Sequence, residues 1–470
     1  MTGASAADIG VIAQALRVQL EERNLDHLER ALGAPRDELS YLVLAVLHRA
    51  VAHPDAIREF TRRWRAEGLS AAVRHKLSSR SEKRRRGTLP VRVVSGVIAD
   101  VTDTARSRFT TGIQRVARET LSRWWGDRDM VLIAWDHRAR RFVTATAAET
   151  ERVVLRPAAA SAAEVIIPFR ATLLLPEIAV DTERAIRLRS IAEFSGSHSV
   201  AIGFDCIPVT TAETAGPGMP GAFSKYLSTL ARFSTVVPIS TAAGDEYRGW
   251  RRMLRGAGIA GPEIIDLDLP FNAHPEPRLT AEFTRKKLQL GPEPVVLAVG
   301  SREPRKNHLA LLHAAELNWR AGRRFSLVLV GGNSWETEEF DELAGRLVRR
   351  GRPLVMLSGV PDDVVWDLYA LARFSVFCSL NEGFGLPVVE SLSYGTPVIT
   401  STFGSMRQLG EGRGALLADP HDGVQIAERM RLLLESDDEL EALRAQAASL
   451  PDSSWDDYAS ALWRLAQPRF

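Results

Sequence analysis

Several features that would place a chain in a special class of protein are scarce in this sequence. Only two cysteines, Cys206 and Cys378, occur in 470 residues, which excludes the disulfide framework of a small secreted protein. The 60 basic residues are balanced by 58 acidic ones, which argues against a dedicated nucleic-acid-binding protein. The apolar runs are too short to span a bilayer, and the first residues lack the basic-then-apolar order of a signal peptide. We therefore expect a cytoplasmic protein that binds no nucleic acid.

The composition that remains is that of an ordinary globular protein. Apolar residues make up 45% of the chain and charged residues 25%, which excludes a largely disordered or fibrous class. A chain of this length typically folds into about three domains. The ten histidines show no spacing typical of metal ligands, so we predict no metal centre.

Residues 1–88 differ in texture from the rest of the chain. Apolar residues at helical spacing predict helices at 17–31 and 38–51, and a third, basic helix from Pro54 to about His75. The block Arg74–Arg86 then holds seven Lys or Arg residues and one Glu. Such a block is either a solvated linker or a weak peripheral contact with the anionic inner face of a membrane. We interpret the whole segment as a helical extension with a basic linker.

From Pro90 onward, strand-like and helix-like segments alternate. The apolar run Val91–Ile98 is typical of a parallel strand covered on both faces. The expected strands are 91–98, 131–135, 171–175 and 199–204, and the expected helices are 112–125, 182–194 and 223–233. This βαβ rhythm predicts a doubly wound α/β domain, to which we assign residues 89–270.

A proline-rich connection, Leu267–Pro277, precedes a second alternating series. This second domain is assigned to residues 271–450, and an amphipathic terminal helix is expected within 451–470. Two such sheets joined by a linker form a cleft at the carboxyl ends of their strands, where α/β proteins bind ligands. The expected strands are 295–299, 325–330, 354–357, 374–378 and 397–400, and the expected helices are 308–321 and 362–372.

The most informative stretch is NEGFGLPVVESLSYGTPVI, residues 381–399. It follows an expected strand, and Gly383 and Gly385 let the backbone turn sharply and approach a ligand closely. Pro387 suits the first position of a helix, and Gly395 suits its left-handed cap. The N-terminus of this short helix therefore points into the cleft, where its free N–H groups and dipole favour an anion such as a diphosphate.

Two carboxylates, Glu382 and Glu390, lie on either side of this turn. Carboxylates repel phosphates but accept hydrogen bonds from hydroxyl groups. Glu390 is thus suited to a ribose diol and Glu382 to sugar hydroxyls, with phosphate between them. The alternative is that both carboxylates merely face solvent at a helix start.

A second strand–turn–helix unit, Val299–Leu312, carries basic residues toward the same cleft. Arg302, Arg305 and Lys306 lie close together there. Cations at this point would neutralise a leaving diphosphate, as a metal ion does in other enzymes. Taken alone, the turn could also be solvated surface. The sequence Asp266-Leu267-Asp268 resembles a metal-binding pattern, but its place at the interdomain connection favours a linker.

These segments resemble the retaining nucleotide-sugar glycosyltransferases of family 4, which have the GT-B fold of two Rossmann-like domains facing a cleft. The E-x7-E pattern of the family is Glu382 to Glu390, and residues 303–308 and 357–380 are also similar. The resemblance covers about residues 93–467 and leaves 1–88 outside. In the N-terminal half, TTGIQRVARETL (110–121), FDCIPV (204–209) and PIS (238–240) resemble bacterial polysaccharide glycosyltransferases.

The resemblance implies a role for each matching residue. The catalytic set is Lys306, Glu382, Arg302 and Arg305, in which Lys306 would hold the donor diphosphate. The donor-binding set is Gly112, Ile113, Gly300, Gly331, Gly332, Gly383, Phe384, Gly385, Leu386 and Glu390, and the acceptor side is Gln114, Arg115 and Asp205. No metal or other cofactor is implied, and the terminal helix would cross back to the N-terminal domain.

Two positions depart from the family pattern. Ser301, and not the common arginine, follows the strand-end Gly300, so either Arg302 or Arg305 would take over that role. Phe204 precedes Asp205 where the family commonly has histidine, which puts the usual sugar contact from this strand in doubt.

The function implied by the resemblance is transfer of a hexosyl or deoxyhexosyl group with retention, from a nucleoside-diphosphate sugar to a hydroxyl group. The acceptor would be a glycan, a lipid-linked molecule or another hydroxyl compound, in surface-polysaccharide or glycoconjugate biosynthesis. A non-catalytic nucleotide-sugar-binding or scaffold subunit is a second reading, which Ser301 and Phe204 favour. A nucleotide-sugar epimerase is a third, but it would need a paired acid and base.

Overall fold

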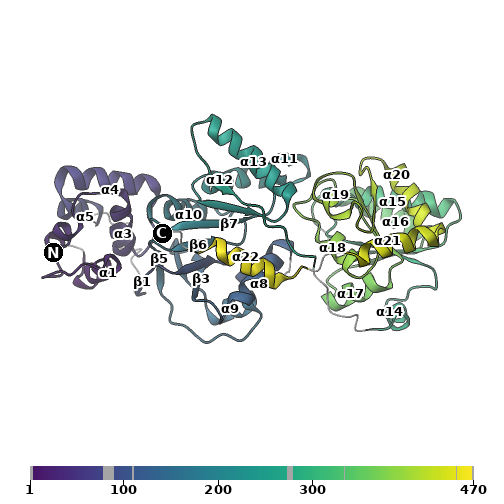
Figure 1. The fold of residues 1–470 in the computed structure, drawn as a ribbon, viewed down its shortest axis with the longest axis horizontal. Coiled ribbons are helices and arrows are strands. Elements are labelled where there is room, and N and C mark those ends of the chain that lie inside the picture. Colours follow the sequence, from purple (N-terminus) through teal and green to yellow (C-terminus); the bar gives the residue numbers. More distant parts are fainter. Residues whose placement is uncertain are drawn as a thin grey trace.

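Three bodies follow one another along the long axis of the protein (Figure 1). The computed structural model describes residues 4–77, 89–107, 111–271, 279–332, 334–450 and 453–467. A helical domain comes first, then an α/β domain with nine strands, then an α/β domain with six. The last helix, α22 (Trp455–Leu465), lies beside the middle body (Figure 1). The chain therefore crosses between the two α/β domains twice.

The helical domain packs on one edge of the middle domain. Its helices are α1 (Ala6–Leu16), α2 (Leu25–Leu32), α3 (Asp37–His48), α4 (Pro54–Glu67) and α5 (Leu69–Leu77). Tyr41 on the buried helix α3 donates a hydrogen bond of 2.9 Å to the carbonyl of Pro168. Apolar side chains from these helices and from β1 (Val91–Val94) and β5 (Val165–Pro168) share one continuous core. The extension is thus packed into the fold.

Two expected helices in this region have the wrong bounds. Only the second half of the helix expected at 17–31 forms, because Arg17 takes a left-handed conformation (φ 57°) and ends α1, and α2 begins only after Asn24. The helix expected from Pro54 to about His75 is divided at Gly68 (φ 84°). Of the basic block, residues 74–77 lie in α5, and 78–86 lie outside the described residues.

The middle domain is built on a sheet with the order β1-β5-β4-β3-β2-β6-β7-β8-β9. All neighbouring strands are parallel except the pairs that include β4. Its other strands are β2 (Val97–Asp100), β3 (Met130–Asp136), β4 (Arg141–Thr144), β6 (Thr172–Leu175), β7 (His198–Gly203), β8 (Thr235–Pro238) and β9 (Glu263–Ile264). Its helices are α7 (Thr102–Arg106), α8 (Gly112–Trp124), α9 (Ala147–Val154), α10 (Thr182–Phe194), α11 (Ile207–Thr210), α12 (Met219–Leu230) and α13 (Thr241–Gly256), with a 3₁₀ turn η1 (Ala212–Thr214).

The single strand expected at 91–98 is wrong. The chain leaves the sheet at Ser95 and Gly96, and β5, β4 and β3 lie between β1 and β2. A continuous apolar run does not distinguish one strand from two, and the interruption is short.

The C-terminal domain is an all-parallel sheet with the order β12-β11-β10-β13-β14-β15. The strand order reverses between β10 and β13, which is the position where open α/β sheets bind ligands. Its strands are β10 (Val295–Val299), β11 (Ser326–Val330), β12 (Leu354–Leu357), β13 (Phe374–Phe377), β14 (Val398–Ser401) and β15 (Ala415–Ala418). Its helices are α14 (Ala281–Lys287), α15 (His308–Arg320), α16 (Glu338–Arg349), α17 (Asp362–Leu371), α18 (Leu386–Ser393), α19 (Gly404–Gly410), α20 (Gly423–Glu435) and α21 (Asp437–Ala448), with a 3₁₀ turn η2 (Pro304–Lys306).

Helix α22 is fixed to the middle domain along α8. The indole N–H of Trp124 donates a 2.9 Å hydrogen bond to the carbonyl of Ala459, and Trp463 packs edge-on against Trp124. Arg123 also pairs with Asp456 at 2.7 Å. Helix α22, which follows the C-terminal domain in the chain, is thus bound to the middle domain and links the two.

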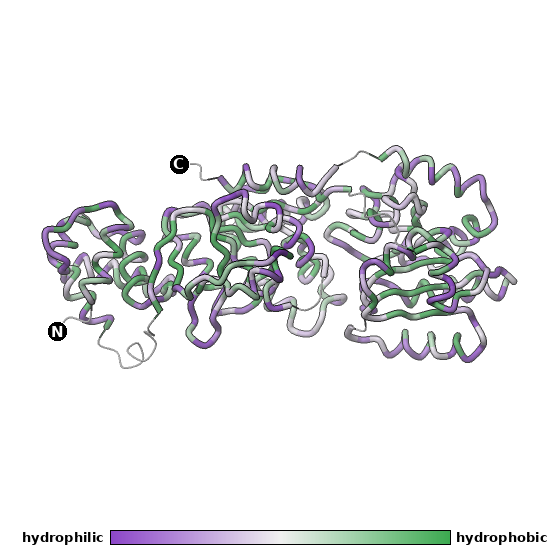
Figure 2. Tube along the Cα trace, turned by 90° about the horizontal axis from the view of Figure 1, so that it is seen from below, coloured by the Kyte–Doolittle hydropathy of each residue, from purple (hydrophilic) through white to green (hydrophobic). Residues whose placement is uncertain are grey.

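Hydrophobic residues concentrate in the strands inside each domain, and hydrophilic residues concentrate along the outer helices (Figure 2). Within the described ranges, the chain contains no helix that is both long and apolar enough to cross a membrane.

Candidate functional site

The loop between β13 and α18 turns sharply at glycine. Gly385 takes φ 107° as the N-cap of α18, and Pro387 is the second residue of this helix, one position later than the sequence predicts. Gly395 (φ 67°) follows the helix end. Helix α18 therefore begins near the carboxyl end of β13, and the positive end of its dipole lies on the side that suits an anion. We call residues 379–386 the donor loop.

Glu382 is the centre of a buried ion cluster in this loop. Its carboxylate lies 2.5 Å from Arg305 Nη1 and accepts hydrogen bonds from Lys306 Nζ at 2.7 Å and Ser379 Oγ at 2.5 Å. Burial alone would raise the pKa of Glu382, but Arg305 and Lys306 outweigh it and lower this pKa to about 2. Glu382 is therefore a fixed anion, an acceptor suited to hydroxyl groups.

Arg305 and Lys306 come from the turn η2 that follows β10. The peptide N–H of Leu380 donates to the carbonyl of Arg305, and Arg305 donates back to the carbonyl of Asn381. Lys306 also lies over the ring of Phe377 at 4.9 Å. The turn and the donor loop thus form one unit at the point where the strand order reverses.

Arg302, in contrast, contacts other residues than Glu382 in the described part of the chain. Its guanidinium donates to Ser358 Oγ at 3.0 Å and lies 6.0 Å from the ring of Phe340. The three basic residues therefore share the region after β10, but only Arg305 and Lys306 pair with Glu382. Of the two arginines left open by the family pattern, Arg305 is the one in contact with Glu382.

The glycines after β10 and β11 allow two backbones to touch. An ideal Cβ on Gly331 would lie 1.9 Å from the carbonyl oxygen of Gly300, so no side chain fits there. The N–H of Arg302 donates to the carbonyl of Gly332 at 2.8 Å. Gly300 in turn packs against the side chain of Lys306. Gly331 and Gly332 thus hold the backbone of residues 300–302 in place, and Gly300 contacts Lys306.

The middle domain contacts the donor loop directly. A Cβ on Gly383 would lie 2.5 Å from the carbonyl oxygen of Phe204 and 2.8 Å from a carboxylate oxygen of Asp205. Ser240, at the start of α13, donates a hydrogen bond to the carbonyl of Gly383. Only glycine at position 383 allows the domains to approach this closely. Phe204 is buried beneath this contact.

Asp205 faces the ion cluster from across the cleft. Burial raises its pKa to about 6, with Glu246 and Glu382 adding to the rise and Arg305 opposing it. Glu246 itself accepts hydrogen bonds from the N–H of Cys206 and the hydroxyl of Thr210. Asp205 therefore lies in the middle domain directly against Gly383 of the donor loop.

Helix α8 begins directly opposite α18. A Cβ on Gly112 would lie 3.4 Å from the side chain of Leu386, so the first residues of the two helices are in contact. Ile113 packs into the interdomain apolar core that includes Phe384. Gln114 accepts hydrogen bonds from the N–H and hydroxyl of Thr111, so its side chain caps α8. Two positive helix ends thus converge near the donor loop.

Glu390 is buried and held from both domains. Arg115 on α8 lies 2.5 Å from its Oε1, and the hydroxyl of Tyr369 donates to its Oε2 at 3.0 Å. The guanidinium of Arg115 also lies 5.5 Å from the ring of Trp366. Residues assigned separately to donor and acceptor sides by the sequence are thus joined in one ion pair.

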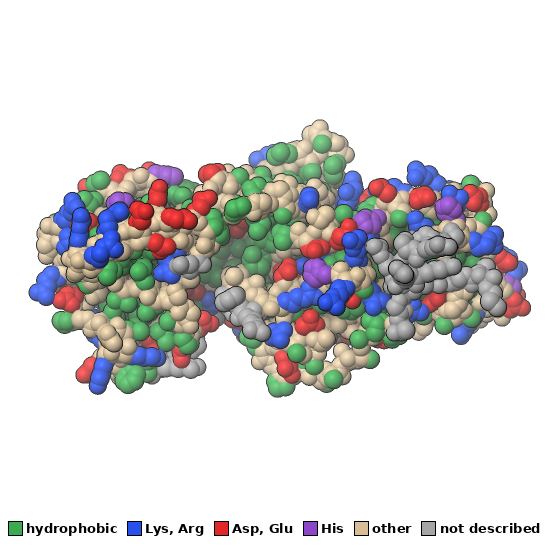
Figure 3. All heavy atoms as spheres, turned by 180° about the vertical axis from the view of Figure 1, so that it is seen from behind, with side chains coloured by type: hydrophobic (Ala, Val, Ile, Leu, Met, Phe, Trp, Pro, Cys, Tyr) green, Lys and Arg blue, Asp and Glu red, His purple; other side chains and the backbone are tan. Residues whose placement is uncertain are grey.

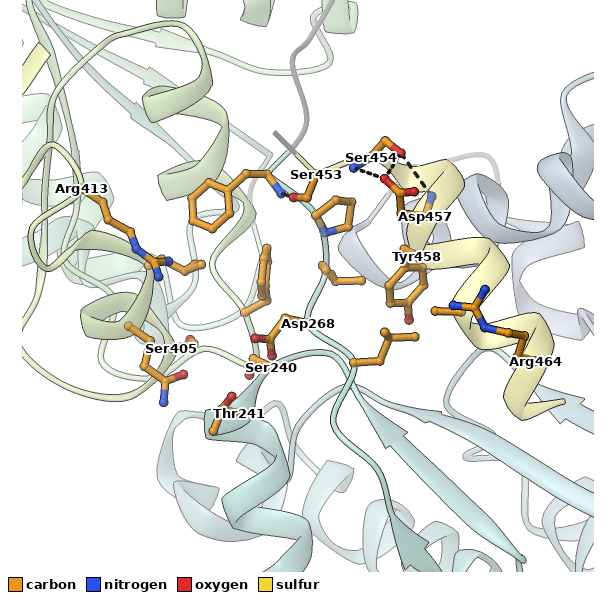
Figure 4. A pocket seen from close by; sticks show the side chains of 18 residues that line it. Ser240, Thr241, Asp268, Ser405, Arg413, Ser453, Ser454, Asp457, Tyr458 and Arg464 are labelled. Atoms are coloured by element: carbon orange, nitrogen blue, oxygen red, sulfur yellow. Dashed lines mark hydrogen bonds between the residues drawn. The ribbon is translucent and has the colours of Figure 1, made fainter. Parts of the chain in front are cut away.

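A cavity of about 710 Å³ lies behind the donor loop, next to the two crossing segments of the chain. Asp268 reaches it from the linker, Arg413 from the C-terminal domain and Tyr458 from α22 (Figure 4). Asp266 lies outside it and pairs with Arg248 at 2.9 Å. In the view from behind, a recess separates the two α/β domains (Figure 3).

No group of three or more potential metal ligands occurs within the part of the chain that the structure describes. Cys206 and Cys378 are buried and unpaired by disulfide. Burial lowers the pKa of His308 to about 4, with Lys306 and Arg302 contributing, so this first residue of α15 is neutral.

The architecture identifies the class of protein. Two Rossmann-like domains, a linker and a returning terminal helix constitute the GT-B fold. Anabaena HepE in complex with UDP has the same fold, with a TM-score of 0.56 at 15% identity over 79% of this chain and 99% of that one. The family model of glycosyl transferases group 1 matches residues 280–450. Residues 280–450 are therefore similar to the glycosyl transferases group 1, in agreement with the resemblance found in the sequence.

Curated relatives match parts of the chain. The O-antigen chain mannosyltransferase B of Escherichia coli is 36% identical over 198 residues, which are 41% of this chain and 51% of the relative. The serotype-specific mannosyltransferase WbdA of Escherichia coli is 26% identical over 234 residues, 48% of this chain and 28% of the relative. The chain thus spans about half of the first relative and less of the second.

Sequence reasoning missed the contacts between the domains. Ser240, Ser379 and Tyr369 hold the donor loop or its glutamates. All three lie in segments that resemble the family, 238–240 or 357–380, but the sequence assigned no contact to any of them. The pairing of Arg115 with Glu390 had no local signal, because 275 residues separate the partners.

Proposed function

We propose that the protein is a retaining glycosyltransferase that uses a nucleoside-diphosphate sugar as donor. It would transfer a hexosyl or deoxyhexosyl group to a hydroxyl of a glycan, lipid-linked or other acceptor, in surface-polysaccharide or glycoconjugate biosynthesis. The observation that carries this proposal is the Glu382 cluster, in which a buried carboxylate and two cations lie at the start of α18. The names of the mannosyltransferase relatives and the UDP bound to the structural neighbour support it.

In this proposal each side chain binds a different part of the donor. The diphosphate lies at the N-terminus of α18, opposite the start of α8, where both helix dipoles favour negative charge. Lys306 contacts the diphosphate, since its ammonium group has three N–H donors. Glu382 accepts from hydroxyls of the transferred sugar, and Glu390 accepts from the ribose.

The reaction needs no protein nucleophile in this proposal. The acceptor hydroxyl attacks the anomeric carbon from the side of the leaving group, and the departing phosphate oxygen takes the hydroxyl proton. Lys306 and Arg305 stabilise the charge that develops on this phosphate, which is the main catalytic contribution. Because these two cations supply the stabilisation, we expect transfer to be independent of added metal.

Closure of the two domains would protect the donor from water. The contact of Gly383 with Phe204 and Asp205 brings the acceptor-side wall against the donor loop. Exclusion of water strengthens the electrostatic interactions and prevents hydrolysis of the donor. We propose a cytoplasmic enzyme in which the basic residues within 74–86 contact the anionic inner face of the membrane peripherally.

A panel of nucleotide sugars tests the proposal directly. The protein is mixed with UDP-, GDP-, ADP- and dTDP-sugars, and thermal stabilisation and slow donor hydrolysis are measured, with and without EDTA. We expect at least one donor to raise the melting temperature and to be hydrolysed at the same rate with EDTA. Stabilisation without any hydrolysis or transfer would favour the non-catalytic subunit, and loss of activity in EDTA would contradict metal independence.

A further inference from the structure

Glu390 already has partners for both carboxylate oxygens. Arg115 pairs with Oε1 at 2.5 Å, and Tyr369 donates to Oε2 at 3.0 Å. The glutamate side chain is only 9% exposed and that of Arg115 19% exposed. A ribose diol that approaches Glu390 therefore meets the guanidinium of Arg115 first.

The two partners of Glu390 come from different domains. Tyr369 belongs to α17 of the C-terminal domain, so it moves together with Glu390. Arg115 belongs to α8 of the middle domain, so its pairing with Glu390 exists only while the domains are close together. The guanidinium of Arg115 also lies 5.5 Å from the ring of Trp366 on α17.

We propose that Arg115 competes with the donor ribose for Glu390 and thereby lowers the affinity for the donor. In the free protein its guanidinium occupies Glu390, and the donor ribose displaces it. This inference rests on the proposed function, because it takes Glu390 as the ribose acceptor. When a side chain of the protein occupies the subsite in most molecules, only the remaining fraction can bind the ligand. The apparent affinity is then the intrinsic affinity multiplied by that fraction.

The proposal predicts that removal of this arginine strengthens binding. An acceptor-binding or domain-clamping arginine would instead leave the affinity unchanged or weaken it when removed. The sign of the change in affinity thus separates the roles. This is an unusual expectation for a charged residue in a cleft that binds an anion, since loss of a cation normally weakens such binding.

Isothermal titration calorimetry with UDP, GDP, ADP and dTDP tests the proposal on the full chain. For the nucleoside diphosphate that wild type binds best, we expect the Kd of Arg115→Ala to fall about tenfold. Arg123→Ala is the matched control, because Arg123 lies on the same helix and pairs with Asp456, away from Glu390. Its Kd should equal that of wild type. An unchanged or higher Kd for Arg115→Ala would overturn the proposal.

Glu390→Ala separates this inference from the function on which it rests. Loss of the ribose acceptor should raise the Kd about tenfold or more, which corresponds to at least one good hydrogen bond to a charged group. If wild type binds none of the four diphosphates, or if Glu390→Ala binds them as wild type does, Glu390 is not the ribose acceptor and the competition by Arg115 is also excluded. If Glu390→Ala weakens binding while Arg115→Ala does not tighten it, only the competition by Arg115 is overturned. Thermal unfolding of each variant verifies that it is folded.

Discussion

Two buried ion clusters, one in each α/β domain, are both built from basic and acidic side chains but differ in the charge at the centre. One has an arginine surrounded by carboxylates, and the other has a carboxylate surrounded by two cations. In the middle domain Arg184 is fully buried. Its Nε donates to Asp100 at 2.8 Å, its Nη1 to Asp103 at 2.6 Å and its Nη2 to Glu177. Glu177 also accepts from the backbone N–H groups of Asp103 and Thr104. All three nitrogens of the guanidinium are thus engaged within one domain, and α7 is tied to the ends of β2 and β6.

The cluster around Glu382 is organised around the anion instead. Arg305 and Lys306 enclose one carboxylate at the cleft, and Gly383, the next residue, contacts the other domain. Lys306 has three N–H donors, and only one hydrogen bond from it is found among the described residues. In the Arg184 cluster every guanidinium nitrogen has a protein partner, which stabilises the fold. In the Glu382 cluster Lys306 has further N–H donors with which it could bind a ligand at the cleft.

The largest effect should follow from opening the Arg184 cluster. Arg184→Ala leaves three carboxylates without their cation, and removal of one partner from a buried ion pair typically costs about 3–5 kcal/mol. Urea unfolding measures the loss. Arg189→Ala is the control, because Arg189 lies on the same helix but is partly exposed and pairs with Glu193 at 3.5 Å; it should change stability by less than about 0.5 kcal/mol. Equal losses in both variants would remove the distinction between buried and surface pairs.

A smaller effect should follow from forcing the two domains apart. Gly383→Ala places a methyl group 2.5 Å from the carbonyl oxygen of Phe204, so the donor loop must shift. A displacement of this size should lower kcat/KM for transfer about tenfold to a hundredfold. Gly221→Ala in α12, where a Cβ meets nothing within 4 Å, is the matched control and should retain wild-type activity. Full activity of Gly383→Ala would show that the close approach of the domains is not needed.

The smallest effect concerns the pH dependence of stability near the cleft. Burial and the acidic neighbours raise the pKa of Asp205 from 3.8 to about 6. Between about pH 4 and about pH 6, the folded protein keeps a proton that the unfolded chain releases, so the contribution of Asp205 to stability falls as pH rises. Asp205→Asn should remove this fall.

Urea unfolding at several pH values measures this difference. Relative to wild type, Asp205→Asn should gain on the order of 1 kcal/mol in the free energy of unfolding as pH rises through the window. Asp245→Asn on α13, whose side chain is 71% exposed, is the control and should follow the wild-type curve. Parallel curves for Asp205→Asn and wild type would contradict the raised pKa.

The donor loop illustrates what could be predicted from sequence. Gly383, Gly385, Pro387 and the flanking glutamates lie in one short segment, so their local geometry determines most of the site. The alternation of strands and helices likewise predicted both α/β domains, because apolar periodicity reflects burial. The break between β1 and β2 was not predicted, because an interruption of two residues leaves the apolar pattern nearly unchanged.

The contacts between distant segments could not be predicted in the same way. Arg184 meets residues more than 80 positions earlier in the chain, and Arg115 meets Glu390 from the other domain. No local spacing encodes such pairs, because they depend on how the sheets are ordered and how the domains dock. The choice between Arg302 and Arg305 has the same origin, since the sequence does not encode that Arg302 contacts Ser358 and Arg305 contacts Glu382.

The most direct test of the proposed chemistry is the transfer rate of Lys306→Ala, with the donor identified by the panel. Loss of a cation that stabilises the leaving phosphate should lower kcat about 100- to 1,000-fold, while the melting temperature stays near that of wild type. Lys286→Ala, an exposed lysine on α14 of the same domain, is the control and should retain full activity. Full turnover by folded Lys306→Ala would contradict the assignment of the Glu382 cluster as the site of sugar transfer.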